Sequence, residues 1–153
     1  MTTIQTPPTS TLTPTSTKSP LHPQDTALKK QAHRITSHPT LSPHRRRVYL
    51  ALLSIPRGRW TTYSALAKHL HSSARAIGTA MRTNPFAPDV PCHRVLAADG
   101  SLGGYMGAGP ASGSANLARK RTMLEDEGVE FEWVDRGTKS GWRARGECFV
   151  KFP

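Results

Sequence analysis

The sequence changes character near residue 45, and this break limits what the chain can fold into. Residues 1–44 are mostly Thr, Ser and Pro, as in TTIQTPPTSTLTPTSTKSP, and they show neither helical nor strand periodicity. Such a composition buries too little apolar surface to offset the entropy of ordering the backbone. We therefore expect a disordered tail over residues 1–44, dispensable for function, with no more than a transient helical turn around 27–35. One folded domain is expected over residues 45–153.

The first part of that domain predicts three helices. Apolar residues recur at helical spacing from about residue 46 and stop before Pro56, which is a helix breaker. Thr62 can cap a second helix that runs to about His71, and Ser73 can cap a third over residues 74–82. Two short helices joined by a tight turn have the form of a helix-turn-helix.

The second part of the domain predicts an extended segment, a helix and a hairpin. Prolines should hold the stretch up to Val95 extended, and a glycine-rich segment follows. Asn116 can cap a helix that ends near Glu127, before Gly128. Alternating residues from 129 and again from 142 predict a terminal β-hairpin. The expected fold class is mainly α with a small terminal β-hairpin, similar to a winged helix-turn-helix.

Charge and cysteine content narrow the classes of function. The formal net charge is +11 with a sequence pI near 10.5, and residues 45–153 alone carry +8. That is typical of a polyanion-binding protein, although solvated basic tails give the same totals. Two cysteines are too few for a disulfide scaffold, and no apolar run is long enough for a membrane span or a secretory signal. We expect no membrane partner and an intracellular, reducing location.

Two features are candidates for function. The helix over residues 74–82 has small residues where a major-groove helix carries long polar ones, which suits either a narrow groove or tight helix packing. Cys92 is followed directly by His93 in a polar, proline-bounded stretch, so His93 is a candidate base for the thiol and Glu127 could orient it. Neighbours on an extended strand point to opposite faces, so this pair needs a turn or a bridging water. Spacing alone favours a structural cysteine, and Cys148 is expected to be one.

The string Pro91-Cys92-His93-Arg94-Val95 closely resembles the active-site motif of the 6-O-alkylguanine-DNA alkyltransferases. Asn84-Pro85 precedes it and Gly104-Tyr105 follows it, as in that family. Residues 74–82 resemble the family's DNA-contacting helix, and residues 120–128 resemble its closing helix. The resemblance covers residues 45–130, which is the C-terminal catalytic and DNA-binding domain of that family.

The resemblance implies a DNA-repair reaction with a role for each matching residue. Cys92 would take the alkyl group from the 6-oxygen of an extruded guanine, irreversibly and once per molecule, as a methylated-DNA–protein-cysteine methyltransferase does. His93 would accept the thiol proton through water, and Glu127 would complete the relay. Asn84 would brace the cysteine loop. Tyr63 would stand beside the rotated phosphate and donate a proton to the leaving guanine.

The same resemblance implies the contacts to DNA. Arg75 would fill the gap left in the base stack, and further DNA contacts would come from Tyr63, Ala74, Ala76, Gly78, Thr79 and Arg82. In the substrate pocket, Tyr105 would line the wall and the backbone from Val95 through Met106 and Gly107 would help hold the guanine. Lys120 would face the active-site loop from the closing helix. The implied partner is double-stranded DNA that contains 6-O-alkylguanine, bound in the minor groove by a monomer without a cofactor. The location would be the nucleus in a eukaryote and the cytoplasm otherwise.

The sequence departs from the family pattern in three places. Members usually carry an N-terminal α/β domain, sometimes with zinc, and we expect neither the domain nor a metal. Met106 stands where many members have a small hydroxyl residue, and residues 108–114 look like an insertion. Alkyltransferase-like proteins, which bind alkylated DNA without transfer, have Trp or Ala at the cysteine position, so Cys92 favours transfer. A winged-helix transcription regulator would not explain the Pro-Cys-His-Arg string.

Overall fold

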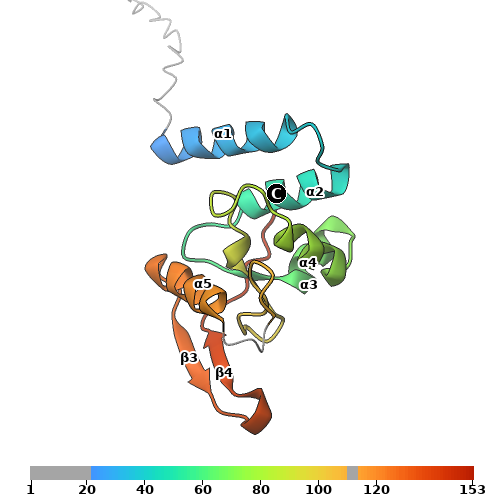
Figure 1. The fold of residues 1–153 in the computed structure, drawn as a ribbon. Coiled ribbons are helices and arrows are strands. Elements are labelled where there is room, and N and C mark those ends of the chain that lie inside the picture. The colour runs from blue at the N-terminus through green and yellow to red at the C-terminus, as the bar shows by residue number, and fades with distance from the viewer. Residues whose placement is uncertain (1–21, 110–113) are drawn as a thin grey trace, which may run out of the picture.

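The structure is a computed structural model that describes residues 22–109 and 114–153 (Figure 1). The elements in chain order are α1 (Pro23–Thr36), α2 (Pro43–Leu53), β1 (Thr61–Thr62), α3 (Tyr63–Leu70), α4 (Ala74–Arg82), the 3-10 turn η1 (Cys92–Arg94), β2 (Val95–Leu96), α5 (Ala115–Asp126), β3 (Phe131–Val134), the 3-10 turn η2 (Gly137–Lys139) and β4 (Gly141–Ala144). Strands β1 and β2 pair in parallel, and β3 and β4 form an antiparallel hairpin. The predicted fold class, mainly α with a small terminal hairpin, is confirmed.

Helix α1 corrects the prediction for the N-terminal part of the chain. Disorder was expected for the whole of residues 1–44, and this is wrong for residues 22–44; residues 1–21 lie outside the described residues. His22 caps the helix by accepting from the Gln24 backbone N–H at 3.3 Å, and Pro23 occupies its first turn. Ile35 is fully buried, and α1 lies across α2 (Figure 1). The average composition of the 44 residues concealed this local helical segment.

The main core joins α2, α3 and α4. Leu52, Leu66 and Ile77 are completely buried in it, one from each helix. Tyr49 is also fully buried, and its hydroxyl donates to the Ala80 carbonyl at 2.9 Å, which ties α2 to α4. Replacing Leu52 with Ala would lower the free energy of unfolding by about 2–5 kcal/mol, since the surrounding helices relax only partially into the gap.

The helix-turn-helix is confirmed, because both of its helices begin at the predicted caps. The Thr62 hydroxyl accepts from the Ala65 backbone N–H at 3.1 Å, and the Ser73 hydroxyl accepts from that of Ala76 at 3.1 Å. His71 ends α3 in the left-handed region with φ of +51°, which turns the chain sharply into α4. The predicted range for α4 agrees with the structure at both ends.

The segment around Cys92 differs from the predicted extended chain. Residues Cys92–Arg94 form one 3-10 turn, in which the Arg94 backbone N–H donates to the Pro91 carbonyl at 3.2 Å. The chain becomes extended only at β2, where Val95 pairs with Thr61 of β1. Because β1 leads directly into α3, this pairing fixes the Cys92 turn beside the start of the helix-turn-helix.

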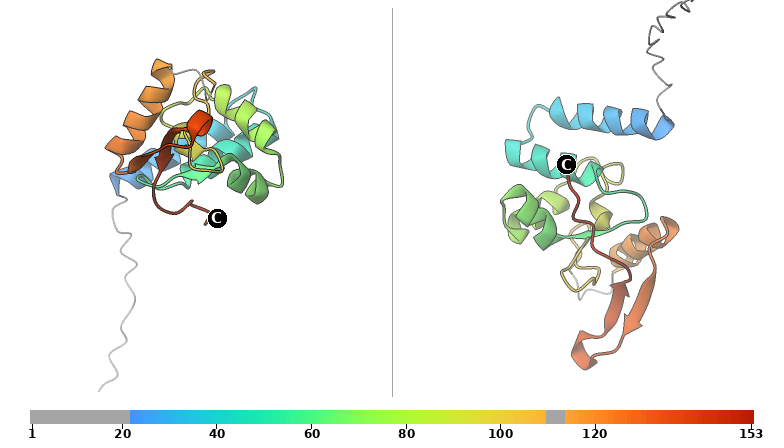
Figure 2. Two further views of the ribbon diagram at one scale, coloured as in Figure 1. Left: turned by 90° about the horizontal axis from the view of Figure 1, so that it is seen from below. Right: turned by 180° about the vertical axis from the view of Figure 1, so that it is seen from behind.

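Helix α5 and the hairpin complete the domain. The N-cap of α5 is Ser114, two residues before the predicted cap Asn116. The hairpin projects away from the body, at the opposite end of the molecule from α1 (Figure 2). Within the described ranges, no helix is both long and apolar enough to cross a membrane.

Candidate active site

Cys92 lies buried at the end of a short, tightly bonded loop. The loop begins at Asn84, whose side-chain amide donates to the Val90 carbonyl at 3.0 Å and accepts from the Phe86 backbone N–H at 2.9 Å. Val90 also accepts from the Cys92 backbone N–H at 2.8 Å, and the Cys92 side chain is only 4 % exposed. The Asn84 side chain therefore bonds to the loop near both of its ends.

Burial and the neighbouring polar groups shift the pKa of the Cys92 thiol in opposite directions. Burial raises the pKa of Cys92, while a hydrogen bond with Asn84 and the positive charge of Lys120 lower it, with burial the larger effect. A thiol reacts as the thiolate, so a buried cysteine with a raised pKa needs a base that removes its proton at the moment of reaction.

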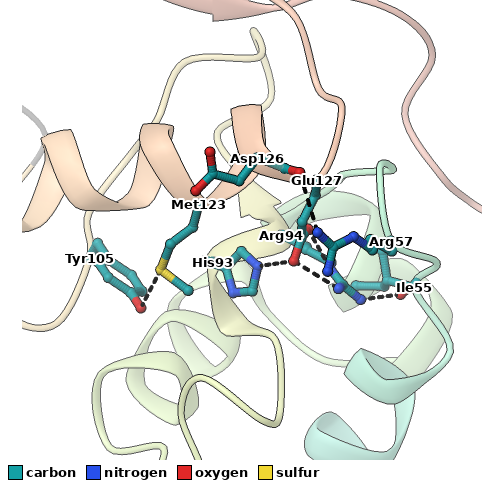
Figure 3. A network of polar contacts seen from close by, with 8 residues as sticks. All are labelled: Ile55, Arg57, His93, Arg94, Tyr105, Met123, Asp126 and Glu127. Atoms are coloured by element: carbon teal, nitrogen blue, oxygen red, sulfur yellow. Dashed lines mark hydrogen bonds and ion pairs between the residues drawn. The ribbon is translucent and has the colours of Figure 1, made fainter. Parts of the chain in front are cut away.

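His93 and Glu127 form the pair from which such a base is built (Figure 3). The His93 Nε2 and Glu127 Oε1 atoms are 2.8 Å apart; the His93 side chain is buried and that of Glu127 is 10% exposed. Burial alone would raise the pKa of Glu127, but hydrogen bonds from His93 and Arg94 bring it down to about 2. Glu127 is thus a carboxylate that can only accept, so His93 Nε2 carries the proton and Nδ1 is left as an acceptor. Nδ1 is buried without a hydrogen-bond partner among the described residues.

Arg94 is a site residue that the sequence analysis did not single out. Its Nε and Nη2 atoms donate to the two oxygens of Glu127, each at 2.9 Å, and its Nη1 donates to the Ile55 carbonyl at 2.7 Å (Figure 3). The two-point contact fixes the plane of the carboxylate that orients His93. Two features of the sequence could have identified Arg94: it directly follows His93, and its charge is opposite to that of Glu127.

Lys120 projects from α5 into the interior and is completely buried. Its ammonium donates to the carbonyls of Val95, Leu102 and Gly104 at 2.7, 2.6 and 3.1 Å. Burial lowers the pKa of Lys120 to about 7, and the charge of a Cys92 thiolate opposes that shift. Lys120 faces the active-site loop as expected, but from behind, so that neither it nor Val95, which supplies one of its carbonyls, is in the wall of the cavity.

A cavity of about 320 Å³ opens between α4 and the loop that follows β2, with Cys92 in its wall. This volume is at the small end of the range for small-molecule sites, about 300–1,000 Å³. The lining residues are Tyr63, Arg75, Gly78, Thr79, Met81, Arg82, Cys92, Gly104, Tyr105, Met106, Gly107, Ala108 and Gly109. Met81 was missed, because a Met on the inner face of a helix gives no signal that separates core from pocket.

The pocket loop has a constrained backbone. Met106 has φ of +48° and is 53 % exposed, and Gly107 has φ of +83°. A Cβ at Gly104 would lie 2.8 Å from the Ala108 carbonyl oxygen, so only glycine fits there. Tyr63 closes the loop from the other side, since its hydroxyl donates to the Gly104 carbonyl at 3.4 Å. Residues 110–113 of the suspected insertion lie outside the described residues.

Helix α4 presents Gly78 and Thr79 at the pocket, whereas its Ala80 is buried in the core. A Cβ added at Gly78 would meet nothing within 4 Å, so helix packing does not require glycine there. Arg75, Thr79 and Arg82 share this open surface with Gly78. Ala74 and Ala76 do not line the pocket. An open helix face with small residues and two arginines can lie close against a polyanion.

Residues 43–129 match the model of the DNA-binding domain of the 6-O-methylguanine DNA methyltransferases. The chain belongs to this family. The resemblance drawn from the Pro-Cys-His-Arg string is thereby confirmed. Within residues 22–109 and 114–153, no group of three or more His, Cys, Asp or Glu side chains is placed to hold a metal ion.

Relatives within the methyltransferase family fall into two kinds. The methylated-DNA–protein-cysteine methyltransferase of Methanothermobacter thermautotrophicus is 40% identical over 89 residues, which is 58% of this chain and 46% of that protein. A DNA base-flipping protein of Thermus thermophilus is 49% identical over 67 residues, or 44% of this chain and 46% of that protein. The chain thus spans about half the length of the curated relatives it matches.

A solved structure with bound DNA is also similar to this chain. Atl1 of S. pombe, in complex with damaged DNA that contains O6-carboxymethylguanine, superimposes with a TM-score of 0.55 at 27% identity. The match covers 70% of this chain and 93% of that one.

Proposed function

We propose that this protein repairs DNA by moving an alkyl group from the 6-oxygen of guanine to Cys92. The observation that carries the proposal is a buried cysteine in the wall of a cavity of about 320 Å³, followed directly by a histidine. The Nε2 of this histidine contacts a carboxylate, and its Nδ1 has no hydrogen-bond partner among the described residues. Relatives named as methylated-DNA–protein-cysteine methyltransferases support it.

The reaction is a single displacement with balanced bonds. His93 Nδ1 takes the thiol proton through a water, and Glu127 stabilises the resulting imidazolium. The Cys92 sulfur then attacks the alkyl carbon, so that a C–S bond forms as the C–O bond breaks and the electron pair stays on the guanine. The His93 imidazolium then gives its proton up through water, the guanine takes up one proton as it leaves, and His93 ends the reaction neutral. The thioether is not hydrolysed readily, so each molecule reacts once.

Tyr63 acts as a hydrogen-bond donor in this scheme. Burial raises the pKa of Tyr63 to about 12, and the neighbouring Cys92 charge adds to the rise. The phenol therefore keeps its proton throughout the neutral range, and it lines the cavity where the leaving guanine would sit. A donor that stays protonated can stabilise the negative charge that develops on the guanine 6-oxygen.

DNA binding would follow from α4 and the basic surface. The guanine 6-oxygen is enclosed in the duplex, so the nucleotide must leave the stack at a cost of a few kcal/mol. Arg75 stands at the rim of the cavity and can enter the gap, while phosphate contacts supply affinity that does not depend on sequence. A small-residue helix suits the minor groove, where readout is degenerate, and a repair protein must accept any neighbouring bases.

A second candidate is a damage sensor that binds alkylated guanine without transfer. The likeness to Atl1, 93% of whose length is covered, and to the base-flipping protein of Thermus thermophilus favours it. Cys92 with its relay favours transfer, because a pure sensor has no use for a thiol that is activated at the lesion.

The deciding experiment weighs the protein after incubation with duplex DNA that carries one 6-O-methylguanine. Transfer predicts one added methyl mass on the Cys92 peptide and none on the Cys148 peptide. Cys92→Ala should show no added mass while retaining DNA affinity, and Cys148→Ser should behave as the wild type. Tight lesion binding with no added mass in the wild type would establish the sensor instead.

A further inference from the structure

Helix α1 has side-chain contacts with the loop that carries Cys92, although it lies outside residues 43–129, the part matched to the family. The Arg34 guanidinium is 3.4 Å from the Asp89 carboxylate and lies over the Phe86 ring at 5.2 Å from its centroid. Gln31 on the same helix accepts from Arg34 at 2.7 Å and donates to Asp89 at 3.4 Å. His38, just after the helix, contacts the Phe86 ring edge-on at 5.6 Å.

These contacts lead to the reacting sulfur in two short steps. Phe86 is buried, and its backbone N–H is the donor that holds the Asn84 side-chain oxygen at 2.9 Å. Asn84 in turn donates to the Val90 carbonyl, which also accepts from the Cys92 backbone N–H at 2.8 Å, and the Asn84 side chain lowers the pKa of the Cys92 thiol. A shift of Phe86 would therefore move Asn84, and with it the partner that favours the Cys92 thiolate.

We propose that α1 is a positioning element for the active site, which acts through Arg34 on the Phe86–Asp89 segment to hold Asn84 against Cys92. This goes against the expectation that residues 1–44 are dispensable. It rests on the proposed role of Cys92 as the reacting group. Arg34 touches neither Cys92 nor the cavity, so it is a positioning residue.

The test uses charge-reversed variants of the full chain and two rates. Arg34→Glu would face Asp89 with a like charge and lose its stacking on Phe86, whereas Lys29→Glu makes the same charge change on an exposed part of α1. One rate is methyl transfer at saturating 6-O-methylguanine duplex. The other is the reaction of Cys92 with iodoacetamide as a function of pH, which needs no DNA.

We expect Arg34→Glu to lower the saturated transfer rate at least fivefold and to raise the apparent pKa of Cys92 in the iodoacetamide profile. Its DNA affinity should match that of Lys29→Glu, which should keep the wild-type rates within twofold. Asp89→Arg added to Arg34→Glu should restore most of both losses, since the pair is then rebuilt with its charges exchanged.

The proposal is overturned if Arg34→Glu, folded as judged by circular dichroism, keeps the wild-type transfer rate and iodoacetamide profile. It is also overturned if the double variant shows no recovery. Should the wild type transfer no methyl group, the proposed function fails, and the iodoacetamide profiles still decide the role of α1.

Discussion

Replacing Glu127 with glutamine removes the charge on which the relay is built, and its cost can be worked out from the structure. The carboxylate accepts from His93 and from two nitrogens of Arg94, and these contacts overcome burial to lower its pKa from 4.5 to about 2. At about 1.4 kcal/mol per pH unit, this difference corresponds to at most about 3 kcal/mol of folding free energy. Because the folded-state pKa is the lower one, the contribution is fully present above about pH 4.5 and is lost as the pH falls toward 2.

Glu127→Gln should therefore lower the free energy of unfolding by about 2–3 kcal/mol at pH 7. The difference in the free energy of unfolding between the variant and the wild type should become smaller below about pH 4.5, since the wild-type carboxyl then begins to take up its proton. Urea titrations of both proteins at several pH values between about 7 and 2.5 measure this difference. The control is Glu125→Gln, whose exposed pair with Arg121 at 3.5 Å should contribute less than about 0.5 kcal/mol.

The same variant tests the orientation of the base. Glutamine has one accepting oxygen and an NH₂ group in place of two accepting oxygens, so its NH₂ group must face a donor of Arg94 or of His93, and the negative charge is lost. The side chain then no longer fixes the proton on His93 Nε2 or stabilises the imidazolium. We expect the saturated transfer rate to fall by about 10²-fold, within the range for loss of general-base catalysis. An unchanged rate, or a stability difference independent of pH, would refute the reasoning about this network.

Three further predictions concern the pocket and the DNA. Arg75→Ala should slow transfer from a duplex more than from a single strand, because only the duplex leaves a gap in the stack; equal slowing would contradict this. Lys120→Met should raise the Cys92 pKa in the iodoacetamide profile, since the nearby ammonium is lost, and an unmoved profile would show that this charge does not reach the thiol. Affinity for duplex DNA should fall linearly on a log–log plot against salt, as counterion release requires, and a flat plot would exclude phosphate contacts as its source.

Local signals in the sequence predicted the helical part of the fold well. The hydroxyls of Thr62 and Ser73 cap α3 and α4 as expected, because capping depends on a few neighbouring atoms. The cap of α5 was misplaced by two residues, since Ser114 and Asn116 are both suitable and tertiary packing decides between them. Helix α1 was missed because its stability depends on burial of Ile35 against residues that sequence patterning does not connect to it.

The candidate site could be predicted in its chemistry but not in its spatial arrangement. The motif indicated Cys92 and His93, but the chain forms a turn there instead of an extended segment, and the long-range pairing of Val95 with Thr61 sets where that turn lies. Lys120 was expected to face the active-site loop, but that it does so from behind, held by three backbone carbonyls, was not predictable. Every residue has a backbone carbonyl, so the sequence does not show which carbonyls converge in the folded chain.

The most direct measurement counts methyl groups. Duplex DNA with one labelled 6-O-methylguanine is mixed in excess with reduced protein, and the label on protein is followed to its end point. The account predicts a plateau of one label per molecule, all of it on Cys92. A label that stays on the DNA, or protein-bound label that fails to map to Cys92, would contradict it.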